Sequence, residues 1–278
     1  MNLEPQHAPA YTLLPACPRL CSCPAACVIM VHATQNGCDH LKSTIKRALR
    51  SLRRTSHHGP AAPQAIPDAE LYRPLYSPWF SAEFERYYRL ADRRSLVSRD
   101  RCYVLYSLAR QAAHATGDFW ECGVYKGGTA AMLAALLRDS APSRKLHLFD
   151  TFQGMPETDA GKDVHRKGDF SDTSLSKVKA YLGGDVRVIF HPGLIPATFA
   201  GLESERIAFA HIDVDIYKSI IDSLDFIWPR LSSGGVVVFD DYGFPTCPGA
   251  RQAVDTFFAQ KPEVPLCLST GQAIVWRL

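Results

Sequence analysis

Four aspartates follow two apolar segments of the sequence, and three of them could together bind a metal ion. The segments are residues 207–210 and 235–239, and the carboxylates after them are Asp213, Asp215, Asp240 and Asp241. Each segment is typical of a buried parallel strand, and the loops after such strands form the ligand crevice of an open α/β sheet. We therefore expect Asp213, Asp240 and Asp241 to meet at one edge, where clustered oxygens suit Mg²⁺ or Ca²⁺. The competing interpretation is that each aspartate caps the next helix, but two adjacent acids concentrate more charge than a cap needs.

A glycine-rich turn further upstream indicates a second ligand site at the same edge. Residues 119–122 read as a strand that carries Glu121 near its end, and Gly123 and Gly127 follow. Glycines allow positive φ and a close approach of the backbone to a ligand. The spacing acid-x-Gly-x-x-x-Gly differs from the dinucleotide pattern and is the form found in S-adenosylmethionine (SAM) methyltransferases. Asp150 ends the next predicted strand, where an acid is the expected partner of ribose hydroxyls.

Four stretches of the chain, taken in order, resemble one enzyme family. They are residues 121–128, 149–156, 213–217 and 240–243. Together they make residues 70–278 similar to the macrocin O-methyltransferases, which methylate sugar hydroxyls in tylosin, mycinamicin and novobiocin biosynthesis. The resemblance implies a class I SAM-dependent fold, a divalent metal such as Mg²⁺, and transfer of a methyl group to oxygen.

The resemblance also implies roles for individual residues. It places the metal on Asp213, Asp240 and Asp241. The cofactor-binding residues that it implies are Glu121, Gly123, Tyr125, Gly127, Asp150 and Phe152. Catechol O-methyltransferase looks like a more distant relative, and Ile216 stands here at the position of its lysine base. A carboxylate near the metal can take the proton instead; we choose Asp213 as the catalytic residue, with Asp215 as the alternative.

Strand and helix patterns alternate along the chain and predict a doubly wound, mostly parallel α/β sheet of seven strands. Strands are expected near residues 119–122, 146–149, 186–190, 207–212 and 235–239. Helices are expected near residues 127–138, 174–182, 217–228 and 249–259. Residues 82–90 and 97–115 read as helices that cover the site, and residues 265–278 carry an antiparallel hairpin signal.

Composition limits the classes of function. The chain has 278 residues, 46% of them hydrophobic, which suffices for a sizeable core. No apolar run approaches the roughly 20 residues of a membrane-spanning helix. The net charge of +3 is unevenly distributed along the chain, because residues 1–60 hold an excess of basic groups. The remaining residues are slightly acidic, so the catalytic part is not expected to bind nucleic acid.

We divide the chain into a low-order tail, residues 1–68, and a methyltransferase domain, residues 69–278, whose helical cover spans 69–116. We interpret residues 1–29 as non-structural: either translation starts at Met30, or these residues are a disordered tail. Residues 41–54 form a basic amphipathic pattern. That segment either contacts the inner, anionic face of the membrane, or it is a solvated helix, or it contacts a second copy in a homo-oligomer. The scattered cysteines of the domain are consistent with a cytoplasmic protein.

Residues 151–174 show no clear period and are too long for an ordinary connection. We interpret them as a lid over cofactor and acceptor, the alternative being a disordered insertion. His165 in this stretch and His191 after it are candidates for the acceptor or cofactor site. A lone histidine is more often structural, so neither enters the predicted catalytic set.

These observations predict a SAM- and metal-dependent O-methyltransferase that acts on a sugar hydroxyl of a glycosylated secondary metabolite or polysaccharide, with vicinal hydroxyls as metal ligands. Two alternatives stay open. One is a metal-dependent methyltransferase of catechols or other phenols, which would have a flatter apolar pocket. The other is a SAM-binding scaffold without activity, which the intact acidic residues argue against.

Overall fold

The computed structural model describes residues 77–278, which belong to a compact unit that spans Pro74–Leu278. The predicted tail, the amphipathic segment 41–54 and the boundary at residue 69 lie outside the described residues. Among the residues that are described, no helix is long and apolar enough to cross a membrane.

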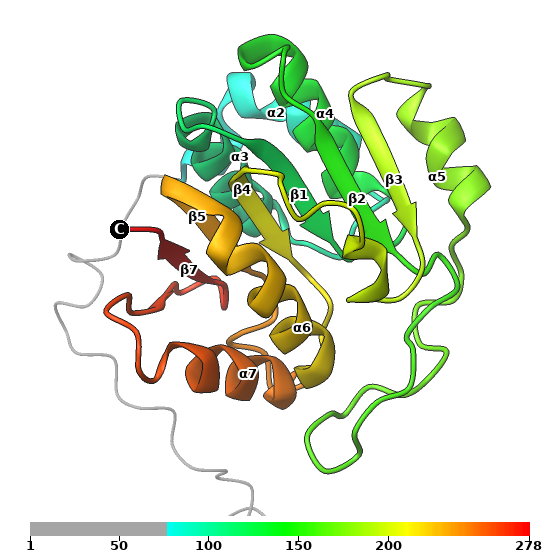
Figure 1. Cartoon of the computed structure of the whole chain (residues 1–278). Coiled ribbons are helices and arrows are strands. Elements are labelled where there is room, and N and C mark those ends of the chain that lie inside the picture. The colour runs from blue at the N-terminus through cyan, green and yellow to red at the C-terminus, as the bar shows by residue number, and fades with distance from the viewer. Residues whose placement is uncertain (1–76) are drawn as a thin grey trace, which may run out of the picture. The chain divides into compact units, whose positions relative to one another are not determined.

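Seven strands form one sheet in the order β3-β2-β1-β4-β5-β7-β6 (Figure 1). Their bounds are β1 Asp118–Cys122, β2 Leu146–Asp150, β3 Val188–Pro192, β4 Ile207–Ile212, β5 Leu231–Phe239, β6 Leu266–Cys267 and β7 Ala273–Trp276. Strands β1 to β5 pair in parallel, and β7 pairs antiparallel with both β5 and β6. The predicted doubly wound sheet and its C-terminal hairpin are therefore confirmed.

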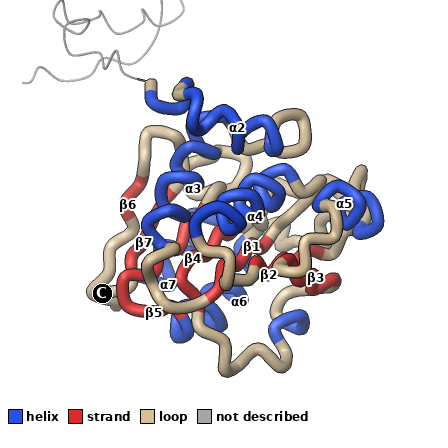
Figure 2. Tube along the Cα trace, turned by 90° about the horizontal axis from the view of Figure 1, so that it is seen from above, coloured by secondary structure: helices blue, strands red, loops and turns tan. Residues whose placement is uncertain are grey.

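Helices cover both faces of the sheet. They are α2 Ala82–Ala91, α3 Arg99–Ala112, α4 Gly128–Ser140, α5 Leu175–Leu182, α6 Tyr217–Ile227 and α7 Pro248–Phe258. Helices α2 to α4 lie on one side of the strands (Figure 2), where their residues Phe84, Leu105 and Leu133 share one hydrophobic core with Phe119 and Phe209. Helices α6 and α7 pack on the other face against Trp120, Ile212 and Phe239. Strands β1, β2 and β4 are almost wholly buried, which is why their sequences read as apolar runs.

The predicted helix over 97–115 starts later than expected and ends earlier. Helix α3 begins at Arg99, after Ser98 in extended conformation, and ends at Ala112. Strand β5 begins at Leu231, four residues before the apolar run that predicted it. Glycines at 234 and 235 weaken the strand pattern there, since glycine has no side chain to pack.

The order of strands reverses between β1 and β4, and the ends of these two strands are held close. The Asp213 amide donates to the Cys122 carbonyl over 2.8 Å. Gly123 has φ +88°, and a Cβ atom there would lie 1.8 Å from the Asp213 carbonyl oxygen. Only glycine fits this position, at the switch point where open α/β sheets bind their ligands.

Candidate active site

A cavity of about 300 Å³ opens at the carboxyl edge of the sheet. Strand ends contribute Gly123, Asp150, Asp213 and Asp240 to its wall. The loop 151–174 contributes Met155, His165 and Phe170, and α3 contributes Arg101. The size suits a small organic ligand, which ordinarily occupies a largely apolar pocket with a few polar groups.

Three carboxylates meet in this cavity as the sequence predicted. Oxygens of Asp213, after β4, and of Asp240 and Asp241, after β5, lie within 4.8 Å of one another. We call them the oxygen cluster. Asp240 and Asp241 are buried, and Asp213 is partly buried. Burial, and then the negative charge of Asp240, raise the pKa of Asp213 well above its usual value; burial and the charge of Asp215 do the same for the pKa of Asp241. Although His211 and Arg101 partly offset this effect at Asp213, burial and the neighbouring carboxylates prevail, which is the condition that a bound cation relieves.

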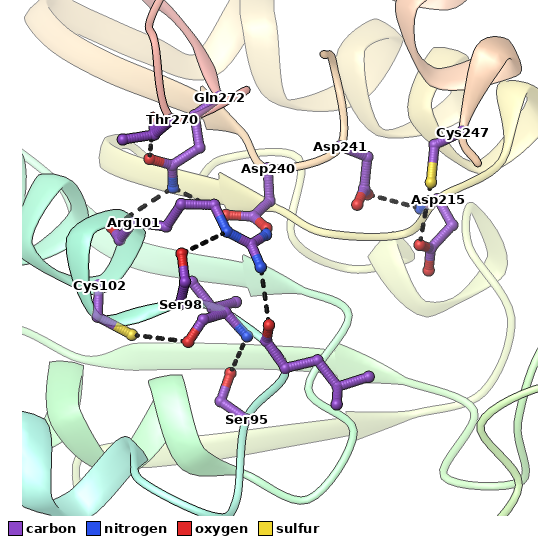
Figure 3. A network of polar contacts seen from close by, with 12 residues as sticks. Ser95, Ser98, Arg101, Cys102, Asp215, Asp240, Asp241, Cys247, Thr270 and Gln272 are labelled. Atoms are coloured by element: carbon purple, nitrogen blue, oxygen red, sulfur yellow. Dashed lines mark hydrogen bonds and ion pairs between the residues drawn. The ribbon is translucent and has the colours of Figure 1, made fainter. Parts of the chain in front are cut away.

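Asp240 is the best-compensated member of the oxygen cluster (Figure 3). The Arg101 guanidinium contacts its Oδ2, and the Gln272 amide donates to its Oδ1 over 2.8 Å. His211 Nε2 lies 3.7 Å from the same Oδ1. Burial opposes ionisation, but His211 and Arg101 outweigh it and lower the pKa of Asp240. Neither Arg101 nor Gln272 was predicted, because a lone basic or amide residue carries no spacing signal.

Glu121 does not line the cavity, and its role at the cofactor stays a prediction. Its side chain is fully buried, and its Oε1 lies 2.9 Å from His211 Nδ1. The reason is register: Glu121 and His211 stand opposite each other in the paired strands β1 and β4. Burial disfavours protonation of His211, yet Asp240 and Glu121 raise its pKa to about 10. Glu121 therefore supports the oxygen cluster from behind, through His211.

Asp150 organises the glycine turn. Its Oδ2 accepts hydrogen bonds from the amides of Val124 at 2.7 Å and Tyr125 at 2.9 Å, and its Oδ1 accepts one from Phe152 at 2.6 Å. A carboxylate has about four acceptor sites, so Asp150 retains capacity for a ligand hydroxyl in the cavity that it lines. The close backbone approach at Gly123 completes a cradle suited to a nucleoside-bearing cofactor.

The other predicted cofactor residues divide into two groups. Tyr125, with φ +51°, lines the cavity. Gly127 and Phe152 do not: Gly127 faces Val178 of α5, and Phe152 is buried in the core. Sequence reasoning also missed Gly193, Leu194 and Ile195, which follow β3 and line the same cavity. Their position after a parallel strand was the signal that could have found them.

A second group of side chains lies in the same wall and was not predicted as a group. His165 Nε2, Asp215 Oδ1 and Cys247 Sγ approach one another to between 3.5 and 3.7 Å. We call them the mixed cluster, since they offer nitrogen, oxygen and sulfur. Figure 3 shows Asp215 and Cys247 beside Asp241.

His191, the other candidate histidine, lies outside the cavity lining and pairs with His147 over 3.0 Å. Burial, and then the charge of His147, lower the pKa of His191 to about 4.

The loop 151–174 contains no helix or strand, yet it is tied to the domain by specific contacts. Asp163 Oδ1 accepts from the Tyr217 amide at the start of α6 over 2.9 Å. The Thr173 hydroxyl donates to the Tyr125 carbonyl in the glycine turn. The loop thus touches both ends of the cavity. Its role as a lid stays a prediction.

Comparisons with known proteins agree with this geometry. Residues 94–277 match the macrocin-O-methyltransferase family. An 8-demethyl-8-(2,3-dimethoxy-α-L-rhamnosyl)-tetracenomycin-C 4'-O-methyltransferase of Streptomyces olivaceus is 32% identical over 174 residues, which cover 58% of this chain and 66% of that protein. The mycinamicin III 3''-O-methyltransferase of Micromonospora griseorubida is 32% identical over 155 residues, which cover 51% of this chain and 60% of that protein. The chain thus spans less than two thirds of the length of these curated relatives.

Solved structures share the fold. The O-methyltransferase NovP superposes with a TM-score of 0.61 at 25% identity, over 66% of this chain and 82% of NovP. The calicheamicin methyltransferase CalS11 superposes with a TM-score of 0.57 at 22% identity, over 88% of this chain and 94% of CalS11. The seven-stranded sheet is therefore the class I methyltransferase fold.

Proposed function

Since the chain belongs to the macrocin-O-methyltransferase family, we propose that it transfers a methyl group from SAM to a sugar hydroxyl of a glycosylated secondary metabolite or polysaccharide. The observation that carries the proposal is the meeting of two sites in one cavity: the Asp150 and Gly123 cradle and the oxygen cluster. The curated relatives are named for methylation of sugar-bearing acceptors. Fold alone would not support this, since one fold hosts many activities.

The residues present fit a divalent cation. The cluster offers carboxylate oxygens only, the donor type that Mg²⁺ prefers. Asp213 and Asp241 lie close to other carboxylates, and burial raises the pKa of both. We propose that Asp213, Asp240 and Asp241 hold the cation. Three protein ligands leave positions for two acceptor hydroxyls, so a vicinal diol is the expected acceptor.

When bound, SAM supplies the electrophilic methyl group and the cation lowers the pKa of the acceptor hydroxyl. The residues of the chain orient the cofactor and keep water out of the cavity. Asp150, Gly123 and Tyr125 orient the cofactor, while Met155, Phe170 and Phe244 form an apolar wall that excludes water. Such positioning supplies much of the rate of a group transfer.

The proton of the acceptor hydroxyl has two candidate acceptors. Asp213 is our proposed base as well as a cation ligand, and Asp215 is the alternative. Burial raises the pKa of both carboxyls, towards the range in which a general base works well at neutral pH. The pair can be separated with Asp215→Asn, which keeps the oxygen cluster intact. If that variant binds Mg²⁺ normally and loses turnover, Asp215 is the base.

The test of the function uses the full chain, SAM, Mg²⁺ and a panel of deoxysugar glycosides with vicinal hydroxyls. We expect S-adenosylhomocysteine to form and one glycoside to gain the mass of one CH₂ group. EDTA should stop the transfer and leave SAM binding intact, as calorimetry would show, and added Mg²⁺ should restore it. Activity that persists in EDTA would reject the metal-dependent mechanism, and NAD binding without SAM binding would reject the cofactor.

A further inference from the structure

The mixed cluster has the shape of a metal site. Three segments that are distant in the sequence bring its members together: His165 from the loop 151–174, Asp215 from the turn after β4, and Cys247 at the N-cap of α7. The three separations are nearly equal. His165 Nε2 lies 3.6 Å from Asp215 Oδ1 and 3.7 Å from Cys247 Sγ, and Sγ lies 3.5 Å from Asp215 Oδ1.

These separations match the edges of a zinc coordination tetrahedron. Zinc binds sulfur at about 2.3 Å and nitrogen or oxygen at about 2.0–2.2 Å, so its tetrahedral ligands lie about 3.3–3.6 Å apart. The observed triangle is within a few tenths of an ångström of those values. A cation at its centre would need only small movements of side chains, and its fourth position would face the cavity that all three residues line.

The hydrogen count of the triangle also points to a cation. His165 Nδ1 lies 3.1 Å from Asp169 Oδ2, so a neutral ring carries its hydrogen there and leaves the Nε2 lone pair facing the cluster. The Asp215 carboxylate is an acceptor too. With the neutral ring, only the Cys247 thiol brings a hydrogen, and it cannot donate that hydrogen to His165 Nε2 and Asp215 Oδ1 at once. A carboxylate on the far nitrogen is, moreover, the usual support of a metal-binding histidine.

The donor types separate this cluster from the oxygen cluster. Nitrogen and sulfur donors favour Zn²⁺ and similar transition metals, whereas carboxylates alone favour Mg²⁺. The two clusters are linked, because the Asp215 amide donates to Asp241 Oδ2 over 2.9 Å. Each donor set therefore selects a different metal, although they lie in one wall.

We propose that His165, Asp215 and Cys247 form a second metal site for Zn²⁺ or a similar transition metal. Binding would tie the loop 151–174 to α7 and would occupy the Asp215 carboxylate. Resting on the proposed function, the consequence is that zinc inhibits methyl transfer by holding the loop and one candidate base in place.

Cobalt(II) provides a direct test, because a cobalt–thiolate bond has its own charge-transfer absorption. The full chain is stripped with chelator, and Cys17, Cys21, Cys23, Cys27 and Cys38 are replaced by Ser so that they contribute no thiolate. We expect one equivalent of Co²⁺ to give the sulfur band. Zn²⁺ should displace it, and excess Mg²⁺ should not. Cys247→Ser should abolish the band, and His165→Gln should weaken binding by more than the about 10–100-fold that loss of an outer partner costs.

Matched controls locate the site. Cys267 is exposed and lies outside the cluster, so Cys267→Ser should keep the band. Asp240→Asn should remove cobalt from the oxygen cluster and also keep the sulfur band. An unchanged band in Cys247→Ser, or displacement by Mg²⁺, would overturn the proposal.

A second measurement guards against a variant that fails to fold. X-ray absorption of the zinc-loaded chain, with the same five cysteines replaced, should show one sulfur ligand at zinc; a shell of nitrogen and oxygen alone would overturn the proposal. Neither measurement depends on methyl transfer. The second site can therefore fail while the proposed function stands, and the reverse also holds.

Discussion

The oxygen cluster and the mixed cluster share one cavity wall, and a single hydrogen bond joins them, yet they are built in different ways. Asp213, Asp240 and Asp241 follow two adjacent core strands, β4 and β5. The buried Glu121–His211 pair supports them from within the sheet. The mixed cluster depends on a long loop, on a turn residue with φ +58° at Asp215, and on a helix N-cap. Its outer support is Asp169, which is only partly buried on that loop.

This difference in construction gives the oxygen cluster a fixed geometry and the mixed cluster a geometry that can change. A site on strand ends is held by the whole core, so its geometry changes only when the core does. A site with one member on a loop can form and break as the loop moves, which suits control better than catalysis. Four substitutions test this contrast, in order of decreasing effect.

The largest effect is expected from Asp213→Asn, which removes a cation ligand and the proposed base. Turnover should fall about 10³-fold at saturating Mg²⁺, because metal-assisted catalysis is worth several kcal/mol. Steady-state rates of S-adenosylhomocysteine formation measure the loss. The control is Asp225→Asn, an exposed residue of α6, which should be indistinguishable from wild type. A fully active Asp213→Asn enzyme would move the base elsewhere and end the catalytic role of the oxygen cluster.

Glu121→Gln tests the buried support of the oxygen cluster. The substitution removes one of the two acidic neighbours of the fully buried His211, and breaking a buried pair on one side costs about 3 kcal/mol. Urea unfolding of the full chain should show that loss of stability. Glu83→Gln removes an exposed ion pair with Arg110 and should cost no more than about 1 kcal/mol. Equal stabilities for the two variants would mean that the buried Glu121–His211 pair does not stabilise the fold.

Asp240→Asn should act on cation affinity more than on chemistry. Loss of one carboxylate charge should weaken Mg²⁺ binding on the order of 100-fold, as ligand charge does at other oxygen sites. Excess Mg²⁺ should then restore much of the turnover, in contrast to Asp213→Asn. Titration of activity with Mg²⁺ distinguishes the two variants, with Asp255→Asn on the exposed side of α7 as control. Failure of rescue at any Mg²⁺ concentration would assign Asp240 a role beyond binding.

The smallest effect is expected from Asp169→Asn, which weakens the outer support of His165. Zinc or cobalt affinity should fall about tenfold, while Mg²⁺ affinity stays unchanged. Asp172→Asn is the control, because Asp172 lies on the same loop and pairs with Lys126 instead. Equal losses of Mg²⁺ and Zn²⁺ affinity would show that the two clusters are one site.

Much of the fold was readable from the sequence. The apolar runs that became β1, β2 and β4 were located almost to the residue, because a strand buried on both faces must be apolar throughout. The acids after β4 and β5 could be placed at one edge, since parallel strands end on the same side of a sheet. That reasoning predicted the oxygen cluster, and its donors lie together in the structure.

Pairing across strands and between distant segments was decided only by the tertiary structure. The register of β1 with β4 sets Glu121 opposite His211, a pairing that the sequence did not predict. His165 and Cys247 are 82 residues apart and meet only because the loop and α7 reach the same cavity. The apolar period of a strand is written in its own residues, whereas register and loop docking depend on how separate elements pack. The sequence therefore determined which edge of the sheet carries the chemistry, and the packing of the chain determined which side chains share it.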